Sequence, residues 1–473
     1  MSSSHSPSRL EKDLLGTREL PAEAYYGVQT LRAAENFCLT GVKLSSYPKF
    51  VIALAMVKHA AASANYQLGH LDKAKFDAIT KACGRIINGE FLDQFIVDMI
   101  QGGAGTSTNM NANEVIANVA LEIMGHQKGD YQHLHPNNHV NMAQSTNDAY
   151  PTAIRVGILL SVQALVDSLN RLIGALRGKG KEFCHILKMG RTQMQDAVPM
   201  TLGQEFQAFA TNLEEDVARI LTLAPELLEP VNIGGTAIGT GINTDPAYQA
   251  AAVGFLAKVS GLNIKAAPDL IEATSDMGDF VLFSGMLKRT AVKLSKMCND
   301  LRLLSSGPRT GIGEINLPAR QPGSSIMPGK INPVIPEAVS QVAFEVIGND
   351  LALTMAAEAG QLQLNPMEPL IAYKLFASID VLKQAIDMLR ELCIEGITAN
   401  EAHCQHLVTQ SIGLITALNP YIGYENSTRI AKEALESGRG VLELVEEEGL
   451  LDKNVLAEVM RPENMIAPRK NCQ

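Results

Sequence analysis

The chain has 473 residues, of which 46% are hydrophobic and 19% charged, and its formal net charge is −10. This length is too great for one compact core, so we expect two or three domains. The acidic balance, without a block of basic residues, argues against nucleic acid as a partner. Seven scattered cysteines, no secretory signal and no apolar run of membrane-spanning length predict a cytoplasmic protein with reduced thiols and no membrane contact.

The first part of the chain, residues 1–146, is mixed in character. Short apolar clusters broken by glycine and proline in residues 13–37 predict loops with a little extended structure. The alanine-rich residues 47–67 predict a helix, because a proline stands where its first turn would begin. Residues 111–124 predict a second helix that ends at a glycine, and residues 133–141 are expected to be irregular.

Long helices are predicted beyond residue 151, because apolar residues recur there at steps of three and four. The first seam consists of Ile158, Val162, Leu165, Leu169, Leu172 and Leu176, and the last of Leu375, Ile379, Leu382, Ile386, Leu389 and Cys393. Three windows between them, residues 199–228, 276–304 and 337–359, have the same periodicity. Helices of about 40 to 50 Å are too long to be buried by one small globule. We therefore expect an elongated bundle whose remaining apolar faces are covered by other copies of the chain.

The helical pattern shortens after residue 397 and is interrupted by glycine and proline, which predicts a small C-terminal helical domain. The predicted protein is therefore mainly α, with three domains. These are a mixed, mostly helical domain (1–146), a central long-helix bundle (147–397) and a small helical domain (398–473). Solenoid repeats and a glycine-rich nucleotide-binding motif after a strand are absent from the sequence.

Four short segments carry polar side chains in patterns suited to ligand binding. They are GTSTNMNANE (105–114), QSTNDAYPT (144–152), GRTQMQDAVPMTLGQE (190–205) and GSSIMPGKINP (323–333). The first three place hydroxyl and amide residues just ahead of a predicted helix. This placement fits an ordinary helix cap, and it also fits a helix N-terminus that binds an anion. The fourth segment is either a loop that closes over a small ligand or a plain surface loop.

Taken together and in this order, the four segments resemble the signatures of the aspartase/fumarase superfamily, whose members cleave C–N or C–O bonds to release fumarate. The resemblance spans most of the chain and is greatest to the aspartase branch. It implies a three-domain, mainly α fold with a central helix bundle, and reversible elimination of ammonia from L-aspartate. It also implies a small dicarboxylate substrate, no organic cofactor and a homotetramer in which each active site combines segments from three chains.

The family pattern implies a role for each matching position. The base is the first serine of the loop, Ser324. The positions that match those stabilising the carbanion as an aci-carboxylate are Thr106, Ser145, Thr146 and Ser325. Those matching the α-carboxylate site are Thr192, Lys330 and Asn332, and Asn147 matches the position that accepts from the ammonium. The amide oxygen of Gln193 is a second candidate acceptor for the ammonium. Such a site needs dense N–H and O–H donors in a dry pocket, because the doubly charged aci-form must be bound more tightly than the substrate.

Two alternatives compete with this interpretation. One is a class II fumarase acting on malate, and the other is a non-catalytic structural descendant of a lyase. Three differences favour aspartate: Gln193 stands where fumarases and some aspartases have histidine, Ala104 where fumarases have serine, and residues 334–337 read Val-Ile-Pro-Glu instead of a Thr-Gln-Cys-Glu type. The presence of Ser324 and Lys330 argues against a structural descendant.

Three histidines, His133, His135 and His139, raise the question of a second site. Their loose spacing makes a metal site less attractive than a structural loop. Fumarases have a secondary dicarboxylate site near an HPND sequence, but residues 135–138 read HPNN here. Some aspartases require a divalent cation such as Mg²⁺ for activation, and nothing in this sequence locates one.

Overall fold

A computed structural model describes residues 7–323 and 325–466. The chain is mainly helical, as predicted, and it divides into two compact units. The N-terminal unit comprises residues up to 166 together with 218–289 and 344–382. The C-terminal unit comprises residues 167–217, 290–343 and those from 383 onward. The division into three domains stays a prediction.

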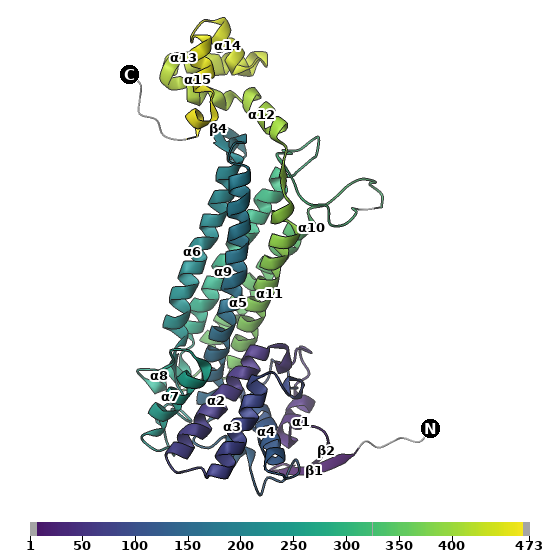
Figure 1. Cartoon of the computed structure of the whole chain (residues 1–473), viewed down its shortest axis with the longest axis vertical. Helices are drawn as coiled ribbons and strands as arrows, with labels where there is room; N and C mark the ends of the chain where they lie inside the picture. The colour runs from purple at the N-terminus through teal and green to yellow at the C-terminus, as the bar shows by residue number, and fades with distance from the viewer. Residues whose placement is uncertain (1–6, 324, 467–473) are drawn as a thin grey trace. The chain divides into compact units, whose positions relative to one another are not determined.

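The N-terminal unit is built around α2 (Pro48–Gln67), the helix predicted from its alanine content. Figure 1 shows α2 beside α3 (Lys73–Ile87) and α4 (Thr106–Ile123), and α2 also packs against α7 (Tyr248–Ser260). Small side chains suit this position because α2 is buried on several faces. The unit also contains a hairpin of β1 (Ser8–Asp13) and β2 (Gly16–Pro21), and β2 lies within residues 13–37, where a little extended structure was expected. Its other elements include α1 (Val28–Asn36), β5 (Pro230–Val231), β6 (Lys265–Ala266) and α8 (Leu270–Ser275).

All the predicted long helices are present, and every residue of the two predicted seams is buried. These helices are α5 (Thr146–Glu182), α6 (Leu202–Leu228), α9 (Gly278–Leu304), α10 (Val334–Glu358) and α11 (Glu368–Leu392). Helix α6 begins later than predicted, because the residues before it form a strand. Thr201 caps it: its hydroxyl accepts the N–H of Gln204 at 3.1 Å, and the Gln204 side chain accepts the N–H of Thr201 at 2.9 Å.

Helix α5 is the most apolar of these helices. Among the residues described, it is long and apolar enough to cross a membrane by length and composition alone. However, 72% of its most apolar window is buried inside the structure, as in the core helix of a bundle. In the C-terminal unit it is tied to α11, because the Ser168 hydroxyl donates to Asp387 at 2.9 Å.

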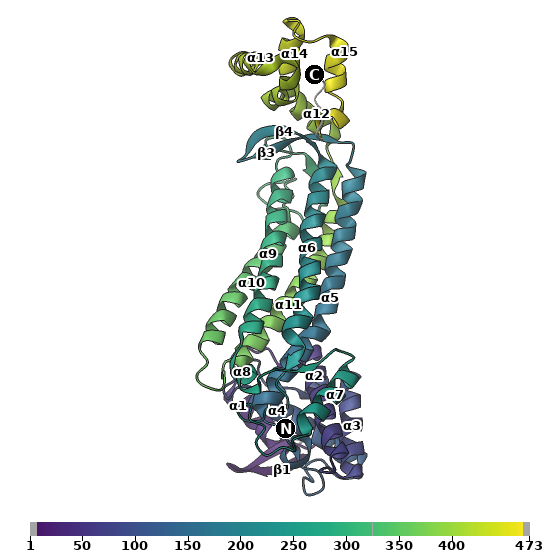
Figure 2. The same ribbon diagram turned by 90° about the vertical axis from the view of Figure 1, so that its left-hand side faces the viewer.

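The C-terminal unit contains a hairpin and a group of short helices. The hairpin consists of β3 (Leu187–Thr192) and β4 (Gln195–Thr201), and Figure 2 shows it below α12 (Glu401–Gln410), which contacts β3. The other elements are β7 (Ile315–Asn316), β8 (Thr398–Ala399), α13 (Ile415–Ser437), α14 (Val441–Glu447), α15 (Lys453–Val459) and α16 (Pro462–Met465). The predicted break near residue 420 is a kink within α13, at Gly423.

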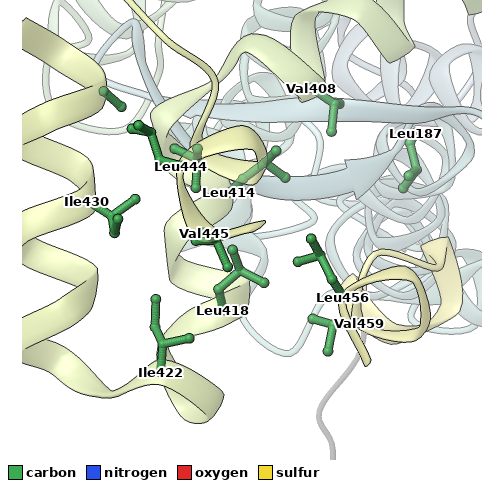
Figure 3. Close-up of a cluster of buried hydrophobic side chains, with 12 residues drawn as sticks. Leu187, Val408, Leu414, Leu418, Ile422, Ile430, Leu444, Val445, Leu456 and Val459 are labelled. Carbon is green, nitrogen blue, oxygen red and sulfur yellow. The ribbon is translucent and has the colours of Figure 1, made fainter. Parts of the chain in front are cut away.

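These short helices share a small apolar core with the hairpin. Figure 3 shows Leu187 of β3 and Val408 of α12 in one cluster with Leu418, Leu444 and Val445. The hairpin is thereby held at its base by hydrophobic contacts. Its far end, where the chain turns, is left exposed.

Candidate active site

The first motif lies at the start of α4. This helix begins at Thr106, earlier than predicted, so the motif occupies its first turn and does not precede it. The three residues before it, Gly103, Ala104 and Gly105, all have left-handed backbones, with φ of 88°, 53° and 88°. A Cβ atom on Gly105 would lie 2.5 Å from the ring of Tyr150. The exposed Thr106 hydroxyl donates to the carbonyl of Gly103 at 2.7 Å, so its proton is engaged within the turn.

The second motif forms the capped start of α5, which confirms the prediction of a helix cap. The Ser145 hydroxyl accepts the N–H of Asn147 at 3.2 Å, and Asp148 accepts the N–H of Ser145 at 2.9 Å. Asp148 is fully buried, and its second oxygen accepts the N–H groups of Gly234 at 3.1 Å and Thr236 at 2.9 Å. Burial raises the pKa of Asp148, while the N–H donors oppose this shift.

Hydrogen bonds fix the direction of the polar groups in this second motif. The side-chain nitrogen of Asn147 donates to the carbonyl of Ala237 at 2.8 Å, so its amide oxygen points elsewhere and remains an acceptor. The Thr146 hydroxyl accepts from the amide nitrogen of Asn109 at 3.1 Å. The hydroxyls of Ser145 and Thr146 therefore both accept a hydrogen bond from the protein.

The third motif is placed differently from our prediction. Thr192 and Gln193 lie at the exposed end of the β3–β4 hairpin, not ahead of a helix. Thr192 pairs with Gln195, so the turn consists of Gln193 and Met194, with φ of 53° and 64°. Such values define a type I′ turn, which ordinarily contains Asn and Gly. Left-handed conformations cost ordinary residues about 1–2 kcal/mol each. This strain suggests that the side chains at the turn have a use.

A buried ionic network lies beneath this hairpin. Glu314 is fully buried, and its carboxylate contacts Arg191 at 2.7 Å and Lys188 at 2.9 Å. Lys188 also pairs with Glu205 in the first turn of α6. The carbonyl of Glu314 accepts the N–H of Asn400 at 2.9 Å. The network therefore ties β3 to the segment that leads into the fourth motif.

The fourth motif is a loop that folds back on itself at Gly323. The N–H of Gly323 donates to the carbonyl of Lys330 at 2.8 Å, and a Cβ atom on Gly323 would lie 2.4 Å from that oxygen. Only glycine permits this approach. Ser325 and Lys330 are exposed beside an open hollow of 590 Å³, and Asn332 is half-buried. Ser324, the predicted base, lies outside the described residues.

The structure groups the predicted site residues in two sets. The N-terminal unit holds Thr106, Ser145, Thr146 and Asn147, and the C-terminal unit holds Thr192, Gln193, Ser325, Lys330 and Asn332. Within the N-terminal unit, the contacts of Gly105 with Tyr150 and of Asn109 with Thr146 bring the starts of α4 and α5 together. The roles of all these residues stay predictions.

The histidine-containing segment is more regular than predicted, because it includes a short π-helix, Pro136–Val140. The ring of His135 accepts the N–H of Asn137 at 3.1 Å, and the ring of His139 accepts the N–H of His135 at 2.8 Å. Burial lowers the pKa of both rings, which favours the neutral, accepting form. These two histidines therefore hold the turn together.

The third histidine, His133, stacks on His126 with ring centroids 3.8 Å apart. In the part of the chain that the structure describes, no group of three or more His, Cys, Asp or Glu side chains is placed to hold a metal ion. A site for a divalent cation therefore stays unassigned.

Two buried residues that the structure places beside the motifs, Lys58 and Glu314, were not identified from the sequence, and Asn109, within the first motif, was given no role there. Lys58 lies within the alanine-rich α2, 2.6 Å from the amide oxygen of Asn109. A lysine in the middle of an alanine-rich helix was a signal, because lysine is almost never fully buried without a partner. Glu314 gave no such signal. Asp148 was signalled by the Ser-x-x-Asp pattern of a capping box.

Comparisons with known proteins agree with this architecture. A family described as lyase matches residues 16–348, and one described as fumarase C C-terminus matches residues 414–467. An aspartate ammonia-lyase of Pseudomonas aeruginosa is 75% identical over 462 residues, which cover 98% of each chain. A crystal structure of "fumarate lyase:delta crystallin" from Brucella melitensis, bound to cobalt, is 56% identical, with a TM-score of 0.95 over 98% of this chain and 100% of that one.

A recombinant class II fumarase from Schistosoma mansoni has the same fold but is less similar in sequence. It is 35% identical, with a TM-score of 0.91 over 98% of this chain and 100% of that one. The helix bundle and its polar segments are thus those of a lyase of the class that acts on small dicarboxylates. The chain belongs to the aspartase/fumarase superfamily, which confirms the family, the fold class and the lyase chemistry expected from the sequence.

Proposed function

We propose that the chain is an aspartate ammonia-lyase, which reversibly converts L-aspartate into fumarate and ammonia without an organic cofactor. The observation that carries this proposal is the 75% identity with an aspartate ammonia-lyase over 98% of both chains, against 35% with a class II fumarase of the same fold. The orientation of Asn147 supports it, because its amide oxygen points away from the Ala237 carbonyl and is an acceptor suited to the substrate ammonium.

The reaction removes a proton from the carbon beside the β-carboxylate. The negative charge left on this carbon then spreads into the carboxylate. Catalysis therefore requires donors that bind the aci-form more strongly than the substrate. Ser145 and Thr146 have suitable hydroxyls at the positive end of α5, each worth about 3 kcal/mol in a dry site. Thr106 would join them once its hydroxyl turned away from Gly103.

The remaining groups complete the reaction. Ser324 takes the proton, and closure of the loop excludes water so that its alkoxide survives. Ser325 adds a donor to the aci-carboxylate. The α-carboxylate is held by Thr192, Lys330 and Asn332. The ammonium leaves from between the amide oxygens of Asn147 and Gln193.

We propose a homotetramer whose active sites each combine segments from three chains. Two observations support it. The predicted site residues are divided between two compact units, and α10 exposes an apolar stripe of Phe344, Leu351 and Met355, which are 62%, 63% and 65% exposed. With Gly348, which has open space around it, the stripe follows steps of four, three and four, as in a seam between helices. A cytoplasmic location and activation by a divalent cation stay predictions.

Ultraviolet absorbance of fumarate tests the activity, with purified protein added to L-aspartate and, separately, to L-malate. We expect signal with aspartate alone. Signal with malate alone would make the chain a fumarase, and silence with both substrates in the presence of Mg²⁺ would favour a structural descendant.

Light scattering tests the assembly. Leu351→Glu places a charge in the α10 stripe and should yield inactive monomers. Leu435→Glu on α13, where the leucine is 73% exposed, is the matched control and should leave the tetramer unchanged. An active monomer would contradict the composite site.

A further inference from the structure

Lys58 is a fully buried lysine whose three nearest polar partners are neutral amides. Its ammonium nitrogen lies 2.6 Å from the side-chain oxygen of Asn109, 2.9 Å from that of Asn141 and 2.9 Å from that of Gln144. An ammonium has three protons, so these oxygens satisfy it completely. Burial lowers the pKa of Lys58, while the charge of Asp148 opposes this shift. The three amide oxygens also favour the charged form.

This arrangement decides how the amide of Asn109 is oriented. An ammonium only donates, so the oxygen of Asn109 must face Lys58 and its nitrogen must face away. That nitrogen donates to the Thr146 hydroxyl at 3.1 Å and to the side-chain oxygen of Asn141 at 3.2 Å. Because the hydroxyl of Thr146 accepts this bond, its own proton is directed elsewhere.

We propose that Lys58 is a positioning residue: through Asn109, it orients the Thr146 hydroxyl so that this hydroxyl donates its proton to the carboxylate of the substrate. The inference rests on the proposed function, because it deepens the role given to Thr146. Bonds that run in one direction polarise each other, so the buried charge strengthens the last donor of the chain. If Lys58 were neutral or absent, the Asn109 amide could turn over, and Thr146 would donate to Asn109 instead of to the ligand.

Asn109→Asp is the most direct test. The new side chain keeps an oxygen against Lys58 but replaces the donating nitrogen by an oxygen that only accepts. The Thr146 hydroxyl must then donate to it, which reverses the hydrogen-bond chain. We expect kcat to fall about 100-fold, with the thermal midpoint of unfolding lowered little, since the new carboxylate pairs with Lys58.

Asn113→Asp is the matched control. Asn113 lies on the same helix, is buried, and donates to Asn141 at 3.2 Å, but among the described residues it makes no hydrogen bond to Thr146. The substitution Asn113→Asp adds the same charge to the same cluster of buried polar side chains. A loss of kcat per folded molecule as large as that of Asn109→Asp would show that charge alone is responsible, and would overturn the proposal.

A double-mutant cycle distinguishes positioning from general damage. Thr146→Val removes the final donor, so adding Asn109→Asp to it should lower kcat by less than about threefold more. If Lys58→Met folds, it should likewise lower kcat by less than about threefold more when it is added to Thr146→Val. If Lys58→Met does not fold, the Asn109→Asp variants decide the outcome. Losses that multiply in the double variant would overturn the proposal.

The outcome for the hydrogen-bond chain can be separated from that for the proposed function. Either L-aspartate or L-malate serves as the substrate for the series, whichever the unaltered protein turns over. If neither is turned over, the proposed function fails, and fumarate binding measured by calorimetry then tests the hydrogen-bond chain from Lys58 to Thr146 by itself. The inference is supported if Asn109→Asp weakens fumarate binding by itself but causes no further weakening in the Thr146→Val background. An affinity for fumarate that Asn109→Asp leaves unchanged would overturn it.

Discussion

The backbone of Gly105 lies so close to the ring of Tyr150 that a methyl group on the glycine would stand 2.5 Å from the ring. Gly105 immediately precedes Thr106, and Tyr150 lies about one turn after Thr146 on α5. This contact therefore sets the distance between the starts of two helices that hold predicted substrate-binding residues. A glycine is required there for two reasons, its φ of 88° and the absence of room for a side chain.

Gly105→Ala should destabilise the protein by about 2–4 kcal/mol, the sum of backbone strain and overpacking. Gly125→Ala is the control, since Gly125 ends the same helix with φ of 83° but has nothing within 4 Å of its Cβ position. Gly125→Ala should therefore lose only the stability that corresponds to backbone strain. Thermal unfolding would measure both, and equal losses would show that the Tyr150 contact is unimportant.

Ser324→Ala should abolish turnover, by at least about a thousandfold, because no other group is proposed to take the substrate proton. The assembly state of the protein and its thermal midpoint should be unchanged. Fumarate formation and light scattering on the same sample would check both expectations. Substantial remaining activity would remove Ser324 from the role of base.

The strained hairpin turn allows a matched pair of variants. Met194→Gly and Gln193→Gly each relieve one left-handed residue, so each should stabilise the fold by about 0.5–1 kcal/mol after the entropy cost of glycine. Activity should persist in Met194→Gly and fall in Gln193→Gly, because only Gln193 is proposed to meet the substrate. Full activity in both variants would leave Gln193 without a role.

Glu314→Gln should be severely destabilising, because it leaves the Lys188 and Arg191 charges without their buried carboxylate. Breaking such a pair from one side costs about 3–5 kcal/mol. Glu214→Gln, which breaks a more exposed pair with Arg177 in the same unit, should cost less than about 1 kcal/mol. Thermal unfolding would compare them, and similar losses would contradict a buried anchor beneath the hairpin.

Glu368 predicts a specific dependence of stability on pH. It is fully buried, burial raises its pKa well above 4.5, and among the residues described neither carboxyl oxygen has a hydrogen-bond partner. The folded protein keeps a proton there that the unfolded chain releases above pH 4.5. The free energy of unfolding therefore falls as pH rises, by up to about 1.4 kcal/mol per pH unit, until the raised pKa is passed.

Glu368→Gln cannot ionise, so this dependence should disappear in the variant. The cost of burying the amide is the same at every pH, so the slope of the thermal midpoint against pH is the quantity to compare. The free energy of unfolding of the variant should rise relative to that of the unaltered protein as the pH increases above about 5, until the raised pKa of Glu368 is passed. Parallel slopes would mean that Glu368 is ionised in the folded state.

The long helices could be predicted from sequence because their signal is local. Steps of three and four apolar residues specify a buried helical face wherever they occur, and both predicted seams are buried. The start of α6 could not be predicted in this way. Pro199 resembles a residue of a first helical turn, yet it pairs with Met189 in a hairpin. A partner strand outside the local window decided its conformation.

In the candidate site, too, residues with a local sequence signal could be predicted and residues that depend on distant partners could not. Residues with recognisable motifs, such as Ser145 and Thr146, were identified through the resemblance, and the helix cap at Ser145 follows from its spacing to Asp148. Lys58 and Glu314 were missed, because their importance depends on partners distant in sequence. Lys58 meets Asn109, and Glu314 meets Arg191, only in the folded chain.

The exposed stripe of α10 also affects how the protein can be produced. If the chain assembles into the proposed tetramer, a newly synthesised copy carries Phe344, Leu351 and Met355 uncovered until it meets another copy. Correct assembly then competes with aggregation, and both accelerate as the concentration of chains increases. The yield of soluble protein should therefore pass through a maximum as expression is raised, and slower synthesis at low temperature should move this balance toward assembly.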